Sequence, residues 1–206
     1  MPSSEQILTG LHDIANSWRG VAIFWHFYFG IIMILLLSGI RPSKRVAGLL
    51  LGLPVLSVSA IAWMSVNPFN GLVFGIVGIL LLIFSARLST DKVQFSPGWV
   101  LTPGAVIFAF GWIYPHFLDT LSFLPYLYAA PIGLIPCPTL SIVIGLALLL
   151  DGLGSRSLSL LLGIMGLFYG ITGVFQLGVA IDLILVLGAV MILIYPFIRK
   201  KRISAS

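Results

Sequence analysis

The sequence predicts an all-α fold: a polytopic membrane bundle of seven transmembrane helices, with its N-terminus outside and its C-terminus in the cytoplasm. Three observations support this class. Only 8% of the 206 residues are charged and 59% are apolar, whereas soluble domains carry about 25% charge. The apolar runs are long and continuous, which favours helices over a membrane barrel. Almost all basic residues fall in loops on one side of the predicted spans.

The first eighteen residues predict an amphipathic helix that lies at the membrane interface in front of the first span. Ser3 and Gln6 have the spacing of a capping box. Apolar residues then recur at helical spacing on one face, namely Ile7, Leu11, Ile14 and Trp18. A short disordered tail is the alternative interpretation of residues 1–18.

Seven apolar runs predict the spans, because a hydrocarbon core about 30 Å thick needs roughly 17–25 helical residues. The runs are 20–40, 46–66, 70–86, 98–116, 132–150, 158–177 and 179–198. The third and fifth are the weakest, and the last two could instead form one re-entrant hairpin. The predicted domains are an interfacial segment (1–18), a seven-span domain (19–198) and a basic cytoplasmic tail (199–206).

The positions of the basic residues predict the orientation. Of the 11 Lys and Arg residues, all but Arg19 follow the first, third, fifth or seventh span. They are Arg41, Lys44, Arg45, Arg87, Lys92, Arg156, Arg199, Lys200, Lys201 and Arg202. Basic loops stay in the cytoplasm, so we expect a multi-pass protein of the bacterial cytoplasmic (inner) membrane. The lipid bilayer is its first partner, and anionic lipid head groups attract the basic tail. This distribution argues against nucleic-acid binding.

Small and aromatic residues predict packing and anchoring. Four glycines of the sixth span share one helix face, which favours close helix packing or, alternatively, a homo-oligomer contact. They are Gly163, Gly166, Gly170 and Gly173. Aromatic residues gather at the outer end of the fourth span and predict an anchor at the head groups. They are Trp112, Tyr114, Tyr126 and Tyr128.

Four polar or reactive side chains predict an outward-facing polar pocket. At a helix rise of about 1.5 Å per residue, they lie roughly 21 to 27 Å above the cytoplasmic boundary. They are His26, Cys137, Asp182 and His116. Ionisable groups at such depth point to function. Each also has a structural interpretation: His26 bonded to a neighbouring helix, His116 at a helix end, Asp182 at a wet helix end, and Cys137 in a buried proline-rich loop.

The stretch GLIPCPT, residues 133–139, predicts a helix break inside the membrane. Pro138 suits the first turn of a helix, which makes Cys137 the N-cap and places Thr139 in that turn. Helix N-termini attract anions. Broken helices at membrane depth line cavities and hold substrates in transporters. The sequence therefore places Pro136, Cys137, Pro138 and Thr139 beside a solute or ion pocket.

The runs YPHF, APIGLIPCPT and FYGITGVFQLGVAIDLILVLGAVMI resemble the C-terminal half of a bacterial multi-pass membrane family of unknown function. That family carries a Pro-Cys-Pro-Thr signature and a later Gly-Val-x-x-Asp at the start of the last span. The resemblance covers roughly residues 110–195. It implies that residues 136–139 and Asp182 are marked positions, with His116 a weaker match, and it implies no activity.

Three function classes remain open from the sequence. Transport or permeation of a small solute, proton or metal ion fits the broken helix and its thiol and carboxylate. A non-catalytic subunit of a larger membrane complex fits the small size and the glycine faces. A membrane enzyme with a metal or haem is the third, since His26 and His116 are of the type that ligates haem iron. No HExxH, GxSxG or paired acidic motif is present, so an enzyme is not favoured. No cofactor is required.

Overall fold

The computed structural model describes residues 3–204, with side chains for residues 3–198. The nine α-helices of this range are α1 (Ser4–Ser17), α2 (Arg19–Leu37), α3 (Lys44–Met64), α4 (Pro68–Ala86), α5 (Gly98–Ile113), α6 (Tyr126–Ala129), α7 (Pro136–Leu149), α8 (Arg156–Ile171) and α9 (Leu183–Ser204). Three short turns of helix join them: η1 (Asp151–Gly154), η2 (Thr172–Gln176) and η3 (Ala180–Asp182). Residues 3–204 form no strand, so the predicted all-α class is confirmed.

Five stretches of the described chain are long and apolar enough to cross a membrane. They are Arg19–Leu37, Lys44–Met64, Pro68–Ala86, Arg156–Gln176 and Ala180–Ile198. The other two predicted spans are shorter than the sequence suggested, with 16 residues in α5 and 14 in α7. Helix α5 ends before Tyr114 because the next residue is proline, which disfavours helical backbone at the residue preceding it. Helix α7 starts late because Gly133 has a positive φ of 71°.

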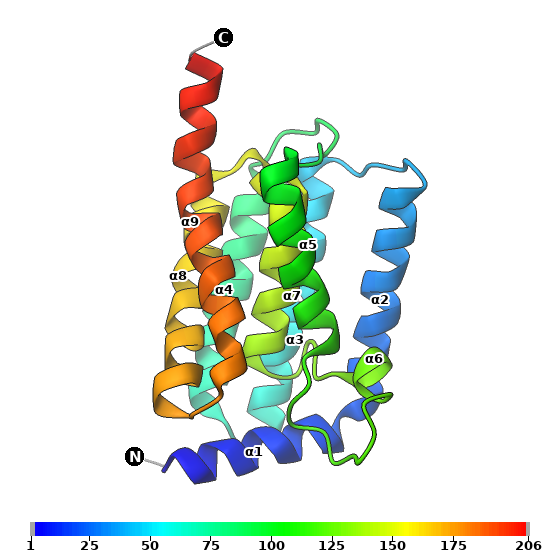
Figure 1. Cartoon of the computed structure of the whole chain (residues 1–206), viewed down its shortest axis with the longest axis vertical. Coiled ribbons are helices and arrows are strands. Elements are labelled where there is room, and N and C mark those ends of the chain that lie inside the picture. The colour runs from blue at the N-terminus through cyan, green and yellow to red at the C-terminus, as the bar shows by residue number, and fades with distance from the viewer. Residues whose placement is uncertain (1–2, 205–206) are drawn as a thin grey trace.

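Helix α7 lies in the middle of the bundle and contacts α3, α5, α8 and α9. Figure 1 shows it enclosed by the other long helices, with α1 lying across one end. Every residue of α7 except Cys137 is buried. A helix surrounded by protein on all sides does not itself need to match the thickness of lipid, which accounts for its short length.

The amphipathic helix α1 is present with the predicted capping box. The Ser3 hydroxyl accepts from the Gln6 N–H at 3.2 Å, and the Gln6 side chain accepts from the Ser3 N–H at 2.9 Å. Leu11 and Ile14 are buried. They pack on a cluster at the end of the bundle that includes Tyr114. The apolar face of α1 therefore covers protein.

The predicted glycine face of α8 is confirmed as a packing surface against α9. A methyl group added at Gly163 would collide with Leu193, and one added at Gly170 would collide with Val186. Because the two helices approach this closely, the first residues of α9 pack directly on the last turn of α8.

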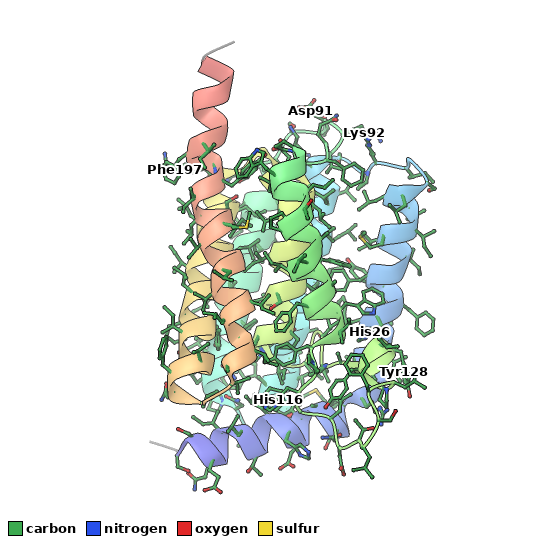
Figure 2. The ribbon with its side chains drawn as sticks, in the orientation of Figure 1. His26, Asp91, Lys92, His116, Tyr128 and Phe197 are labelled. Carbon is green, nitrogen blue, oxygen red and sulfur yellow. The ribbon has the colours of Figure 1, made fainter. Side chains whose placement is uncertain are left out.

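The basic loops gather at the end of the bundle opposite α1. Ser43 and Lys92 form an isolated bridge. Arg41 donates to the Gln94 side chain at 3.2 Å, and the Lys44 ammonium lies 3.9 Å from the Asp91 carboxylate. Figure 2 shows Asp91 and Lys92 at one end, with His116 and Tyr128 at the other. The bundle therefore has a basic end and an α1 end.

Candidate functional site

Three helix ends meet beneath α1 and form one buried polar cluster. Tyr114 caps the end of α5, Cys137 lies in the first turn of α7, and Asp182 precedes α9. The Tyr114 hydroxyl donates to Asp182 Oδ1 at 2.8 Å. The Cys137 thiol interacts with both of these side chains. We call these residues the Tyr114–Cys137–Asp182 cluster.

The start of α7 differs by two residues from the sequence prediction. Ile135 is the N-cap, with an extended backbone, and Pro136 is the first helical residue, the position that proline prefers. The expectation that Cys137 is the N-cap was therefore wrong, since Cys137 is already inside the first turn. Its sulfur lies 3.9 Å from the Tyr169 carbonyl oxygen on α8.

Thr139 stabilises the turn before α7 through two hydrogen bonds of its hydroxyl group. Its hydroxyl accepts from the Gly133 N–H at 2.8 Å and donates to the Ile135 carbonyl at 2.7 Å. A side chain at Gly133 would collide with the ring of Trp25. Thr139, Pro136 and Pro138 are all buried. Their contacts hold the helix break in shape, and Cys137 is the member of this motif whose side chain reaches the cluster.

An irregular connection between α8 and α9 places Asp182 in the cluster. Helix α8 passes into the π-helical turn η2, and the chain reverses at Gly178, where φ is 73°. π turns inside α-helices are frequent at functional sites. Gly173 leaves room for the carboxylate, because a methyl group there would collide with Asp182 Oδ2. Asp182 is 1% exposed, so the alternative of a wet helix end was wrong.

Two cluster neighbours extend the polar contacts toward α4. The Tyr169 hydroxyl donates to Asn70 Oδ1 at 2.7 Å, and both residues are buried. The sequence assigned Tyr114 to an aromatic anchor and placed Asn70 at the start of the third predicted span. The one sequence signal for Tyr114 is the proline that follows it, because this proline ends α5 and makes Tyr114 a helix-end residue.

His26 lies apart from the cluster. Its ring nitrogens are 2.9 Å from the Ala22 carbonyl oxygen and 3.0 Å from that of Trp112. The interpretation of His26 as bonded to a neighbouring helix is confirmed. Because both nitrogens already face carbonyl oxygens, neither is free to ligate haem iron or another metal.

His116 lies in the loop after α5, where its backbone N–H donates to the Tyr114 carbonyl at 2.8 Å, but its side chain makes no hydrogen bond to the cluster among the described residues. Its ring is 4.3 Å from that of Phe117. Partial burial, together with the nearby His12 of α1, holds the pKa of His116 below its usual value. The structure thus brings together Cys137 and Asp182 but not the two histidines. Among the described residues, no three His, Cys, Asp or Glu side chains are grouped so that they could hold a metal ion.

The polar cluster is closed in this conformation. Asp182 is buried, Cys137 is half-buried, and the apolar side chains of α1 pack on the surrounding residues. A cavity of about 260 Å³ lies elsewhere, between α2, α5 and α6, and touches His26. The residues that line this cavity do not include Cys137, His116 or Asp182.

Comparisons with protein-family models, with curated proteins and with solved structures found no match to this chain. The resemblance to the family with the Pro-Cys-Pro-Thr signature stays a prediction.

Proposed function

We propose that the chain is an integral membrane protein that moves protons, alone or coupled to a small solute, through the Tyr114–Cys137–Asp182 cluster. One observation carries this proposal. A carboxyl group is buried where three helix ends meet, and no Lys, Arg or His side chain in residues 3–198 pairs with it.

The proposed topology has seven spans, with the basic end in the cytoplasm and α1 on the outer surface. Five stretches satisfy the length requirement by themselves. The shorter α5 and α7 run inside the bundle beside them. Basic loops favour the cytoplasmic side, and the apolar belt of α2, α3, α4, α8 and α9 suits the bacterial inner membrane. The basic tail then meets anionic head groups.

The chemistry of the cluster favours a proton. An ionised carboxylate without a cation is costly in a low-dielectric site, and it is relieved when it binds a proton or another cation. Here Tyr114 donates one hydrogen bond to the carboxylate. The cluster offers one thiol and one carboxylate, too few ligands for the usual metal sites. Broken helices at the site match the way transporters hold their substrates.

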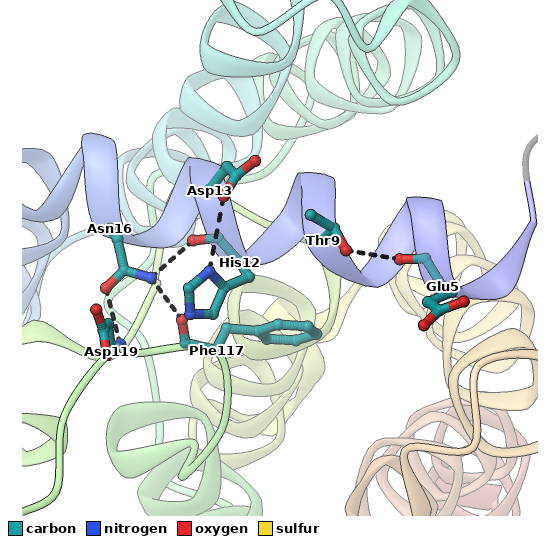
Figure 3. Close-up of polar contacts among 7 residues, drawn as sticks. All are labelled: Glu5, Thr9, His12, Asp13, Asn16, Phe117 and Asp119. Carbon is teal, nitrogen blue, oxygen red and sulfur yellow. Dashed lines mark hydrogen bonds and ion pairs between the residues drawn. The ribbon is translucent and has the colours of Figure 1, made fainter.

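Access to the cluster from the outer side requires α1 to move. Ser4 at its start donates to the Gln176 carbonyl at 2.8 Å. Near its end, Asn16 accepts from the Asp119 N–H at 2.8 Å and donates to the Phe117 carbonyl at 2.9 Å (Figure 3). These three bonds tie α1 to the two connections that surround the cluster, so α1 is suited to act as a gate.

Proton flux in proteoliposomes tests the proposal. With an imposed pH gradient and valinomycin to balance charge, vesicles with the protein should equilibrate faster than protein-free vesicles. Asp182→Asn, which keeps the side-chain shape but removes the acid, should abolish the excess flux. Asp119→Asn changes an exposed carboxylate and should leave it intact. Equal flux through wild type and Asp182→Asn would contradict the proposal.

A further inference from the structure

A groove with one open side lies between α2, α5 and α6, away from the polar cluster. Its volume is about 260 Å³, and it is lined by Gly30, Ile31 and Ile34 of α2, Trp112 of α5, and Leu127 and Tyr128 of α6. His26, whose two ring nitrogens face carbonyl oxygens, also lines the groove, and the other lining side chains are almost entirely apolar. Ile31 and Ile34 are more than half exposed, so the groove opens on the apolar surface of the bundle.

Two long side chains of α2 bond to α3. The Trp25 indole donates to the Ser57 hydroxyl at 2.9 Å, and the Tyr28 hydroxyl donates to the Leu50 carbonyl at 2.9 Å. Gly30 faces α5 and has no side chain to fill the space between the two helices. The nearest atom to a methyl group placed at Gly30 would be on the Trp112 ring, at an ordinary contact distance of 3.5 Å.

A cation stands beside the groove at the α1 end. The Arg19 guanidinium lies 5.9 Å from the Tyr128 ring centre, and its Nη2 is 3.5 Å from the Tyr128 hydroxyl. No carboxylate among the described side chains pairs with Arg19. Figure 2 shows Tyr128 at this end, with His26 further along α2. Arg19 therefore places an unneutralised positive charge next to the apolar groove.

We propose that this groove binds one anionic phospholipid, with an acyl chain between α2 and α5 and its phosphate against Arg19 and the Tyr128 hydroxyl. Apolar walls and an unpaired guanidinium at one end complement the two parts of such a lipid. Guanidinium groups are well suited to phosphate oxygens. This site does not depend on proton movement through the Tyr114–Cys137–Asp182 cluster.

Native mass spectrometry of the detergent-purified protein tests the head-group part, with phosphatidylglycerol and phosphatidylcholine of matched chains as probes. One phosphatidylglycerol should be retained about fivefold more than phosphatidylcholine, the preference expected from one basic residue near a membrane surface. Arg19→Gln should bring the ratio close to one. Arg156→Gln removes a comparable cation that stacks on Phe197 and should leave the preference unchanged.

The acyl-chain part is tested by filling the groove. Gly30→Leu should reduce retention of both lipids, because its side chain occupies the space between α2 and Trp112. Gly20→Leu is the control on the same helix, since Gly20 has open space around it. Equal retention of the two lipids by wild type, or the same loss in Arg156→Gln as in Arg19→Gln, would overturn the site. So would undiminished binding in a folded Gly30→Leu protein.

Discussion

Asp182 occupies a costly position, because its carboxyl group is buried and its partners are one phenol and one thiol rather than a cation. Tyr114 in turn is fully buried, so its hydroxyl depends equally on this partner. Cys137 completes the group as a small polarisable neighbour. The three side chains are therefore expected to respond to substitution as one unit.

Tyr114→Phe tests this coupling at the residue scale. Removing the hydroxyl should lower the free energy of unfolding by about 1–2 kcal/mol, the range of polar bonds between membrane helices in peptides. In an Asp182→Asn background the same change should cost less. Thermal unfolding of the four proteins in one detergent gives the double-mutant cycle. Additive effects would mean that the two side chains are not coupled.

His116 should make α1 docking sensitive to pH. Its pKa in the folded protein is depressed by burial and by His12, so the unfolded state binds a proton first as the pH falls below about 6.5. Stability is then present above that pH and is lost on acidification. His116→Gln should flatten the dependence between pH 8 and pH 5, measured by thermal unfolding. His12 lies 3.7 Å from Asp13, so protonation of His12 also contributes to the pH dependence. Comparing His116→Gln with the double variant His116→Gln/His12→Gln separates the His12–Asp13 contribution from that of His116.

The sequence could identify Cys137 and Asp182 because a thiol between prolines and a carboxylate in an apolar run are conspicuous. It could not bring them together, since helix rise gives height along the bundle and not direction around each helix. For the same reason it could not show whether the side chains of His26 and His116, at similar height, point toward the other two. Tyr114 and Asn70 were missed because an aromatic residue and an amide near a helix end have common structural roles.

At the scale of elements, α1 is held by few polar contacts. Asn16 bridges two points of the loop after α5, whereas Thr9 bonds only to the Glu5 carbonyl within α1 itself (Figure 3). Buried Leu11 and Ile14 supply the apolar part of the contact. Few polar bonds therefore have to break if α1 moves away from the bundle.

Asn16→Ala should loosen α1 selectively. Two lost bonds, each worth about 1 kcal/mol net, should raise amide hydrogen exchange in residues 4–17 by about thirtyfold. Thr9→Ala is the matched control, because it removes a hydroxyl whose bond stays inside the helix. Exchange that rises equally in both variants would show that Asn16 does not hold α1 to the bundle.

At the scale of the whole molecule, composition was enough to predict an apolar helical bundle, and loop charges were enough to predict which loops share an end. The lengths of α5 and α7 were not predictable from hydropathy, because a helix buried in protein and a helix exposed to lipid are equally apolar. The position of α1 was not predictable either. Its apolar face suits a membrane surface and a protein surface equally well. In the structure the hydrogen bonds of Ser4 and Asn16 hold this face against the rest of the protein.

In the proposed function, protons reach Asp182 when α1 moves away from the Tyr114–Cys137–Asp182 cluster. The most direct measurement is proton flux in proteoliposomes with α1 locked by a reversible bifunctional thiol reagent across Ser4→Cys and Gln176→Cys. Both positions are exposed, and Ser4 contacts the Gln176 backbone. Each single variant, treated with the same reagent, controls for modification of Cys137. Cross-linking should stop the flux and a reductant should restore it; undiminished flux through the locked protein would contradict proton entry past α1.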